Sequence, residues 1–312
     1  MVEACGLSPV DIQFLQELHL LQNPHPVGRE IAGIVKEVGP SVKFFKPNDE
    51  VVGILPLGCT QSGLSTLVAV HAHFIVPKPP ALSWDDAAGA VSEGLGAYTA
   101  LHYLGHVAPR DFIIVADGAL MSGLMLVQLA MHRGARVLAT VLSAEEEDFL
   151  RCLQPAPARV INLAESGSQG LHKACMEETA GLGADLVIDS GVRMFGDCED
   201  GEVGKIHKYD VINLLAVGGR WVTKQSSLQL DPPDSRLLQM KGGSVCFLNT
   251  ETWLLSCTQL GSYLHILRDI MEKLVSGALR SRLEVVPVSK AVAAMQRVQH
   301  GDRLLKRVVR LD

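Results

Sequence analysis

A short loop bounded by two glycines has the residue types and spacing best suited to chemistry. It consists of Gly118, Ala119, Leu120, Met121, Ser122 and Gly123. An apolar, strand-like stretch (112–116) precedes it, and a helix is predicted over 124–133. Backbone N–H groups and the helix dipole at such a position favour an anion, for instance the pyrophosphate of a dinucleotide.

The loop keeps only part of the glycine pattern G-x-G-x-x-G. Gly118 is predicted to make the tight turn, and Gly123 to let the helix pack against the strand. Leu120 stands where the middle glycine would allow close approach of the pyrophosphate to the backbone. The loop is therefore either a working cofactor loop or the remains of one.

The end of the next predicted strand (135–141) bears on which dinucleotide would fit. An acid there suits NAD, whereas basic residues suit the 2′-phosphate of NADP. The strand ends without an acid and is followed by Ser143, a predicted helix cap and a candidate cofactor contact, and by four acids at 145–148. These acids either repel a phosphate or form the solvated first turn of a helix, and the second interpretation is favoured. The sequence shows no clamp for a 2′-phosphate at this strand end.

Three other candidates have a functional and a structural interpretation. Tyr98 could orient a substrate, although packing between helices is favoured. Asp189 ends a predicted strand at the edge where doubly wound sheets bind ligands, and a ligand contact and a strand-end cap are equally favoured. His71 and His73 share a strand face but have no third ligand nearby, so a metal site is not favoured.

Composition excludes several classes of protein. The chain has 312 residues, 47% of them hydrophobic, and a net charge of −6, which argues against nucleic-acid binding by bulk charge. Its apolar runs are too short to span a bilayer, and no secretory signal is visible. Its seven cysteines form no C-x-x-C pair, so we expect free thiols in a reducing compartment and no zinc lobe.

The chain divides into three predicted segments. Residues 1–82 are rich in short strands, one of them expected within 66–70, separated by glycine and proline, which is typical of a small barrel-like domain. Over 83–258, from the predicted cap Ser83, strands alternate with helices, so we expect an α/β domain with a doubly wound parallel sheet. One of its strands is expected at 211–215. Residues 259–312 return to a different pattern of helices and strands and are expected to rejoin the first domain.

Two long stretches resemble a known family. They are "PVGREIAGIVKEVGPSVKFFKPNDEVVGI" and "AAGAVSEGLGAYTALHYL". The sequence resembles the quinone oxidoreductase branch of the medium-chain dehydrogenase/reductases over nearly its whole length. This resemblance implies a GroES-like barrel beside a Rossmann-like domain. It also implies that the barrel lacks its first one or two strands, because the sequence begins inside it.

The resemblance implies hydride transfer from NADPH to a quinone, with departures that weaken the expectation. Zinc-dependent relatives carry a catalytic Cys and His at the positions that match Ser8 and Arg29, so no zinc is expected. Ser8 could still donate a hydrogen bond. Arg29 could meet a phosphate or a carboxylate, although an ion pair, for instance with Glu30 or Asp49, is favoured. The family's threonine is Gly96 and its frequent lysine is Glu147. With Leu120, these changes cluster where the cofactor would bind, and we expect weak or lost activity.

The resemblance also implies a different class of function. Vertebrate proteins that resemble this sequence are associated with the FERRY complex, a Rab-GTPase effector assembly of the cytosol and early endosomes. A non-catalytic interaction subunit that keeps the fold is therefore the alternative to an enzyme. A homodimer through edge strands is common in the family. The long stretch 194–209 is a candidate partner surface.

Overall fold

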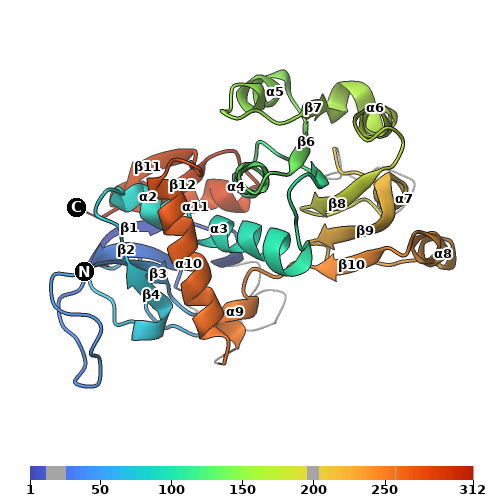
Figure 1. Cartoon of the computed structure of the whole chain (residues 1–312). Coiled ribbons are helices and arrows are strands. Elements are labelled where there is room, and N and C mark those ends of the chain that lie inside the picture. The colour runs from blue at the N-terminus through green and yellow to red at the C-terminus, as the bar shows by residue number, and fades with distance from the viewer. Residues whose placement is uncertain (12–25, 195–203, 257, 312) are drawn as a thin grey trace. The chain divides into compact units, whose positions relative to one another are not determined.

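The computed structural model describes residues 1–11, 26–194, 204–256 and 258–311 (Figure 1). The chain forms two compact units. The first unit consists of Met1–Leu95 and Thr250–Asp312, and the second unit is Gly96–Asn249.

A six-stranded sheet forms the centre of the first unit. Its strands are β1 (Val2–Gly6), β2 (Glu30–Ile34), β3 (Glu50–Ile54), β4 (Ile75–Pro77), β11 (Leu283–Pro287) and β12 (Lys306–Arg310). Their order is β11-β12-β1-β2-β3-β4, and β1 is antiparallel to both of its neighbours. The C-terminal segment therefore completes the sheet that the N-terminal segment begins. The strand expected within 66–70 does not form, although Thr66 accepts a hydrogen bond from the N–H of Val2.

Helices cover the first unit's sheet. They are α2 (Trp84–Gly89), α9 (Thr252–Leu255), α10 (Leu260–Val275) and α11 (Ala291–Gln299), with single 3-10 turns at η1 (Ala72–Phe74) and η3 (Val288–Lys290). Ser83 caps α2 as predicted, because its hydroxyl accepts the N–H of Asp86 at 3.0 Å. The helix α10 buries Ile266 and Ile270, as its apolar stripe requires.

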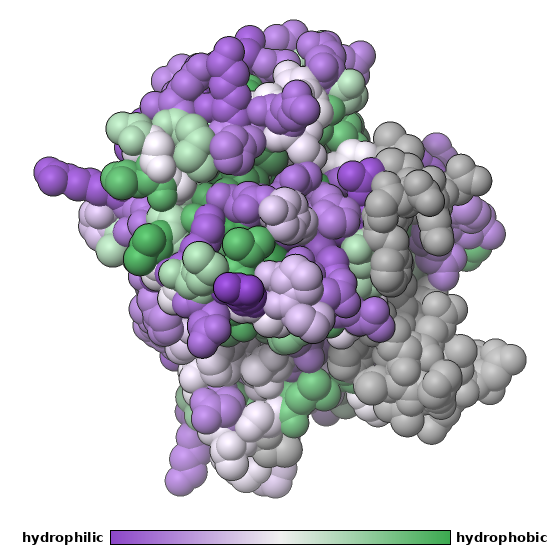
Figure 2. Space-filling model, turned by 90° about the vertical axis from the view of Figure 1, so that its right-hand side faces the viewer, coloured by the Kyte–Doolittle hydropathy of each residue, from purple (hydrophilic) through white to green (hydrophobic). Residues whose placement is uncertain are grey.

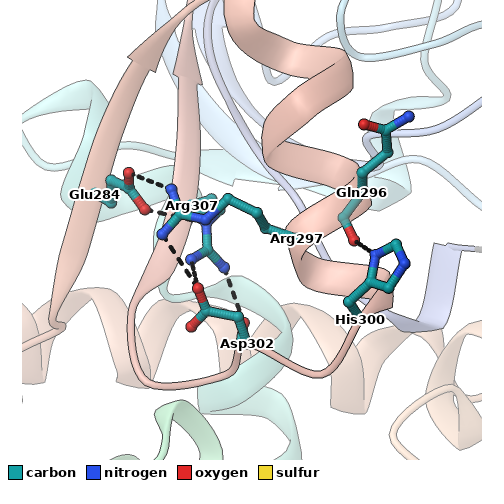
Figure 3. Close-up of polar contacts among 6 residues, drawn as sticks. All are labelled: Glu284, Gln296, Arg297, His300, Asp302 and Arg307. Atoms are coloured by element: carbon teal, nitrogen blue, oxygen red, sulfur yellow. Dashed lines mark hydrogen bonds and ion pairs between the residues drawn. The ribbon is translucent and has the colours of Figure 1, made fainter.

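A neutral network of four charged side chains ties β11, α11 and β12 together (Figure 3). The fully buried Arg307 pairs with Glu284 and Asp302. Arg297, from α11, reaches the same two carboxylates at 2.8 and 3.1 Å. Two guanidinium groups thus balance two carboxylates around the connection between the last two strands.

The second unit contains a six-stranded sheet whose strand pairs are all parallel. Its strands are β5 (Phe112–Val115), β6 (Arg136–Val141), β7 (Arg159–Asn162), β8 (Ala184–Asp189), β9 (Leu215–Thr223) and β10 (Ser244–Phe247). The order β10-β9-β8-β5-β6-β7 shows that the chain moves outward from β5 in one direction and then in the other. This order confirms the doubly wound sheet, and its switch point lies between β5 and β8.

Helices alternate with these strands. They are α3 (Val91–Tyr98), which starts in the first unit, the π-helical η2 (Thr99–Leu104), α4 (Met121–His132), α5 (Ala144–Arg151), α6 (Leu163–Glu178), α7 (Lys208–Leu214) and α8 (Pro232–Lys241). The strand predicted at 211–215 is wrong, because α7 extends to Leu214. Val211 and Ile212 are fully buried on that helix, and a short apolar run does not distinguish a buried strand from a buried helix. Among the described residues, no helix is long and apolar enough to cross a membrane.

Candidate functional site

The predicted cofactor loop is the turn between β5 and α4. Asp117, just before the loop, has a φ of +53° and is the left-handed residue of the turn. Its carbonyl accepts the N–H of Leu120, and its own N–H donates to the hydroxyl of Thr140 at 3.2 Å. The sequence assigned the tight turn to Gly118, but the residue in the left-handed conformation is Asp117, one position earlier.

Internal packing explains why both loop glycines are needed. A Cβ atom at Gly118 would lie 2.7 Å from the Cβ of Ala139, in the neighbouring strand. A Cβ atom at Gly123 would lie 2.1 Å from the carbonyl oxygen of Asp117. Both distances are shorter than real contacts, so each glycine allows strand, turn and helix to approach one another. Their presence is a requirement of the fold and does not itself indicate a ligand.

The remaining loop residues lie together at the start of α4. Leu120 is the half-buried N-cap residue, with an extended conformation and no side-chain cap hydrogen bond. Ala119 and Met121 are buried, whereas Ser122 is half-buried. The structure thus brings the six predicted residues into one turn, with the branched side chain of Leu120 at the helix N-terminus.

A carboxylate that the sequence reasoning missed lies at the same turn. The Asp117 side chain accepts a hydrogen bond from the Ser190 hydroxyl at 2.6 Å. Ser190 directly follows β8, so this bond crosses the switch point of the sheet. The signal that could have found it is an acid directly after the predicted strand 112–116.

Asp189, at the end of β8, is buried and held within its own sheet. Its carboxylate accepts hydrogen bonds from the indole N–H of Trp221, the hydroxyl of Thr223 at 2.8 Å and the N–H of Gly191 at 2.7 Å. Burial raises the pKa of Asp189, and these donors lower it in part. The nearby Asp117 carboxylate raises the pKa further, which places two acids close together at this edge.

Ser143 caps α5 at the end of β6. Its hydroxyl accepts the N–H of Glu146 at 3.2 Å, and the Glu146 carboxylate accepts the N–H of Leu142 at 2.9 Å. Glu147 pairs with Arg151 one turn later. Two of the four acids are therefore engaged by the helix itself and its N-terminus, in agreement with the favoured interpretation of this stretch.

The chain that follows β8 passes close to the end of β6. A Cβ atom at Gly204 would lie 2.3 Å from a side-chain carbon of Leu142. Arg193 and His207 form an isolated parallel bridge at the base of this segment. Part of the predicted partner surface at 194–209 lies outside the described residues, but Gly204 borders the same strand end as Ser143.

Tyr98 packs among other side chains of the second unit. It is 6% exposed, the Arg133 guanidinium lies 4.9 Å from its ring centroid, and the His102 ring lies at 5.2 Å. This environment is the aromatic packing that the sequence favoured for Tyr98.

In the first unit, Ser8 lies in a turn organised by Asp11. The buried Ser8 accepts the N–H of Val10 through its hydroxyl at 3.4 Å. The Asp11 carboxylate accepts the N–H of Ser8 at 3.4 Å and that of Gly28 at 3.0 Å. Burial raises the pKa of Asp11 to about 6, although the Arg29 guanidinium opposes this shift.

Arg29, which the family resemblance aligns with a metal ligand, forms a buried ion pair. It donates to both carboxylate oxygens of Glu251, at 3.3 and 2.7 Å, and through Nε to the carbonyl of Leu55 at 2.9 Å. The expected ion pair is confirmed, but its partner is Glu251 and not Glu30 or Asp49. Burial lowers the pKa of Arg29, but Glu251 outweighs this effect and the pKa rises.

Glu30 has a different cationic partner. Its carboxylate lies 2.5 Å from the ammonium group of Lys306, and both side chains are almost fully buried. Within the described parts of the chain, no group of three His, Cys, Asp or Glu side chains could hold a metal ion. The buried charged side chains around Arg29 and Glu30 are therefore joined in internal ion pairs.

Comparisons with known proteins agree with this architecture. Residues 1–92 match the alcohol dehydrogenase GroES-like domain. The chain is 46% identical to quinone oxidoreductase-like protein 1 of Mus musculus over 99% of its own length and 89% of that protein. Two solved structures share the fold. An alcohol dehydrogenase superfamily protein from Novosphingobium aromaticivorans has a TM-score of 0.83 at 24% identity, with 100% of this chain and 90% of that chain covered.

The second solved structure is the quinone oxidoreductase of Escherichia coli complexed with NADPH. It has a TM-score of 0.77 at 22% identity, with 99% of this chain and 90% of that chain covered. A GroES-like barrel beside a doubly wound sheet defines the class of medium-chain dehydrogenase/reductases. The match to the mouse protein is long and specific, and the chain belongs to the quinone oxidoreductase-like family within that class.

Proposed function

We propose that this chain is a zinc-independent, quinone oxidoreductase-like protein that has lost tight NADPH binding. In this proposal it serves as a non-catalytic subunit of a multiprotein assembly. The supporting observation is the turn between β5 and α4, where a carboxylate and the branched Leu120 stand at the position that would hold a pyrophosphate. The retained Gly118 and Gly123 do not argue for a working site, because packing alone requires them.

The end of β6, where the adenosine of a dinucleotide would lie, supports the same proposal. The Ser143 hydroxyl is used as a helix cap, and the Glu146 carboxylate lies against the backbone of Leu142. The segment that contains Gly204 lies against the Leu142 side chain. An acid and an additional chain segment at this strand end support the proposal, because an NADP site needs basic side chains and free space.

The first unit supports the zinc-independent part of the proposal. A guanidinium group has no lone pair to offer a metal, and a serine hydroxyl is a poor ligand for zinc. Arg29 is also committed to Glu251 and Leu55. The residues that match the metal ligands of zinc-dependent relatives are thus part of the packing.

Calorimetric titration of the purified chain with NADPH and NADH tests the loss of the cofactor. We expect no binding up to millimolar cofactor from a protein whose thermal unfolding is cooperative. The Escherichia coli quinone oxidoreductase, whose NADPH complex is known, serves as the positive control. Micromolar binding of NADPH by the chain would refute the proposed loss.

For the assembly, we propose membership of the FERRY complex, with the chain in the cytoplasm and recruited to early endosomes through its partners. The support is the family itself and the fact that one fold can host unrelated functions. Co-expression with the other subunits, followed by size-exclusion chromatography, tests this membership. Stoichiometric co-elution is expected, and elution of the chain as a separate species would contradict it.

We also propose a homodimer through the free edge of β10, which is the last strand of the second sheet. Phe247 on this strand is 55% exposed. Figure 2 shows one face of the molecule, on which hydrophobic residues are interspersed with hydrophilic ones. Pairing of two β10 strands would satisfy their edge hydrogen-bonding groups.

Replacing the central Val245 with proline should abolish the dimer in sedimentation measurements, whereas a dimer that survives would place the interface elsewhere.

Weak NADPH-dependent reduction of a quinone is the second candidate. It is favoured by the strand, turn and helix N-terminus, because the same arrangement binds a pyrophosphate in dinucleotide-binding proteins. Bound NADPH would supply the hydride. The same titration separates the two functions, and quinone turnover would be measured only if the cofactor binds.

A further inference from the structure

We propose that Asp117 is the residue that excludes the dinucleotide, by holding a fixed negative charge at the site of the pyrophosphate. This inference rests on the proposed loss of NADPH binding. It differs from the expectation drawn from the sequence, which attributed the defect to Leu120 together with Gly96 and Glu147. The geometry around Asp117 supports it.

The Asp117 carboxylate is held in place. The backbone N–H of Asp117 donates to Thr140 in β6, on one side of β5. Its side chain accepts from Ser190, which follows β8 on the other side of β5. The backbone is thus anchored to β6 and the carboxylate to Ser190, so the charge stays at the switch point, where doubly wound folds bind their ligands.

The Asp117 carboxylate lies beside another acid. Asp189 ends β8 directly before Ser190, the residue that donates to Asp117, and the two carboxylates are close enough for their charges to interact. The three donors to Asp189 are neutral groups, so they bring no positive charge to this place. A pyrophosphate at this edge would add two further negative charges in a partly desolvated place, where repulsion is screened less than in water.

The charge and the backbone conformation of Asp117 can be changed separately. Asp117 occupies the left-handed region, which glycine adopts freely and asparagine tolerates. Asparagine keeps a side-chain oxygen that can accept from Ser190 and removes only the charge. Glycine removes the side chain and favours the same φ. Neither change is expected to prevent folding.

The experiment compares NADPH binding by calorimetry across matched variants. Asp117→Asn is expected to raise the affinity at least tenfold over the wild type, and this gain should shrink as the salt concentration rises. Asp117→Gly with Leu120→Gly should gain further. Asp148→Asn is a matched control, because it makes the same change of charge as Asp117→Asn but in α5. Leu120→Gly alone is the second control and removes only the branched side chain. Each control should change the affinity less than threefold. Thermal unfolding of every variant checks that the fold is kept.

The outcomes separate this inference from the proposed function. Tight binding by the wild type would refute both, because nothing would then be excluded. No binding by the wild type and no gain with Asp117→Asn would leave the proposed function standing and overturn the role of the charge. A gain with Leu120→Gly that equals or exceeds the gain with Asp117→Asn would also overturn it. A gain specific to Asp117 would support it.

Discussion

The charged groups at the centre of the first unit and those at the sheet edge of the second unit differ in how they are paired. Arg29 with Glu251, and Lys306 with Glu30, are buried pairs that join segments far apart in the chain. At the carboxyl ends of β5 and β8 in the second unit, Asp117 and Asp189 are two acids held by neutral donors. The first arrangement contributes to the fold, whereas the second concentrates negative charge where a ligand would bind.

This difference teaches that a departure from a family pattern can have two physical meanings. Arg29, which the family resemblance aligns with a metal ligand, donates three hydrogen bonds to Glu251 and Leu55 within the first unit. At the cofactor turn, Asp117 keeps the shape of the turn and changes its charge. Substitutions in the first unit should therefore alter stability, and those at the turn should alter binding.

The largest effect is expected for Glu251→Ala. It leaves the Arg29 guanidinium buried without its counter-charge, which should reduce the free energy of unfolding by about 3–5 kcal/mol. Urea unfolding measures this loss. The double variant Arg29→Met with Glu251→Leu is the control, since replacement of a buried pair by apolar residues is often nearly neutral. A single variant as stable as the wild type would show that the pair is not buried in solution.

Asp189→Ala tests whether an acid at the ligand edge also has a structural role. It removes the acceptor of Trp221, Thr223 and Gly191 and should cost about 3–4 kcal/mol, because three buried donors lose their partner. The change is measured by urea unfolding, with Trp221→Phe as a comparison that removes only one donor. An Asp189→Ala protein of unchanged stability would make Asp189 a residue free for ligand contact.

A pH dependence should distinguish Asp11 from the ion pairs. Burial raises its pKa to about 6 in the folded state, from a usual value of 3.8. The folded protein therefore binds the proton more tightly than the unfolded chain. As the pH falls from about 7 to 4, the wild type should gain up to about 3 kcal/mol relative to Asp11→Asn. Parallel stability profiles for the two proteins over this range would contradict the raised pKa.

The smallest effect is expected for Ser143→Ala. Loss of the cap on α5 should cost about 1 kcal/mol, seen as a small decrease in the unfolding midpoint. NADPH binding by the Asp117→Asn protein should be unchanged when Ser143→Ala is added. A clear loss of that binding would assign Ser143 to the cofactor and weaken the contrast between the two regions.

Local features were predictable from the sequence, and distant partners were not. The caps Ser83 and Ser143 were predicted correctly, because a cap depends on residues within one turn. The partner of Arg29 was missed, because Glu251 lies 222 positions away and no local pattern connects them. The turn residue was assigned one position late, because the conformation of Asp117 depends on contacts with two neighbouring strands.

The place of β1 between β2 and β12 has a consequence for synthesis on the ribosome. The second unit is encoded within Gly96–Asn249 and can fold as soon as that stretch has emerged. The first sheet is complete only after residues 283–310 have been synthesised, because they form β11 and β12. Its N-terminal strands therefore lack these neighbours until translation is nearly finished. During that interval β1 presents an open edge, and chaperones are expected to act on this part of the nascent chain.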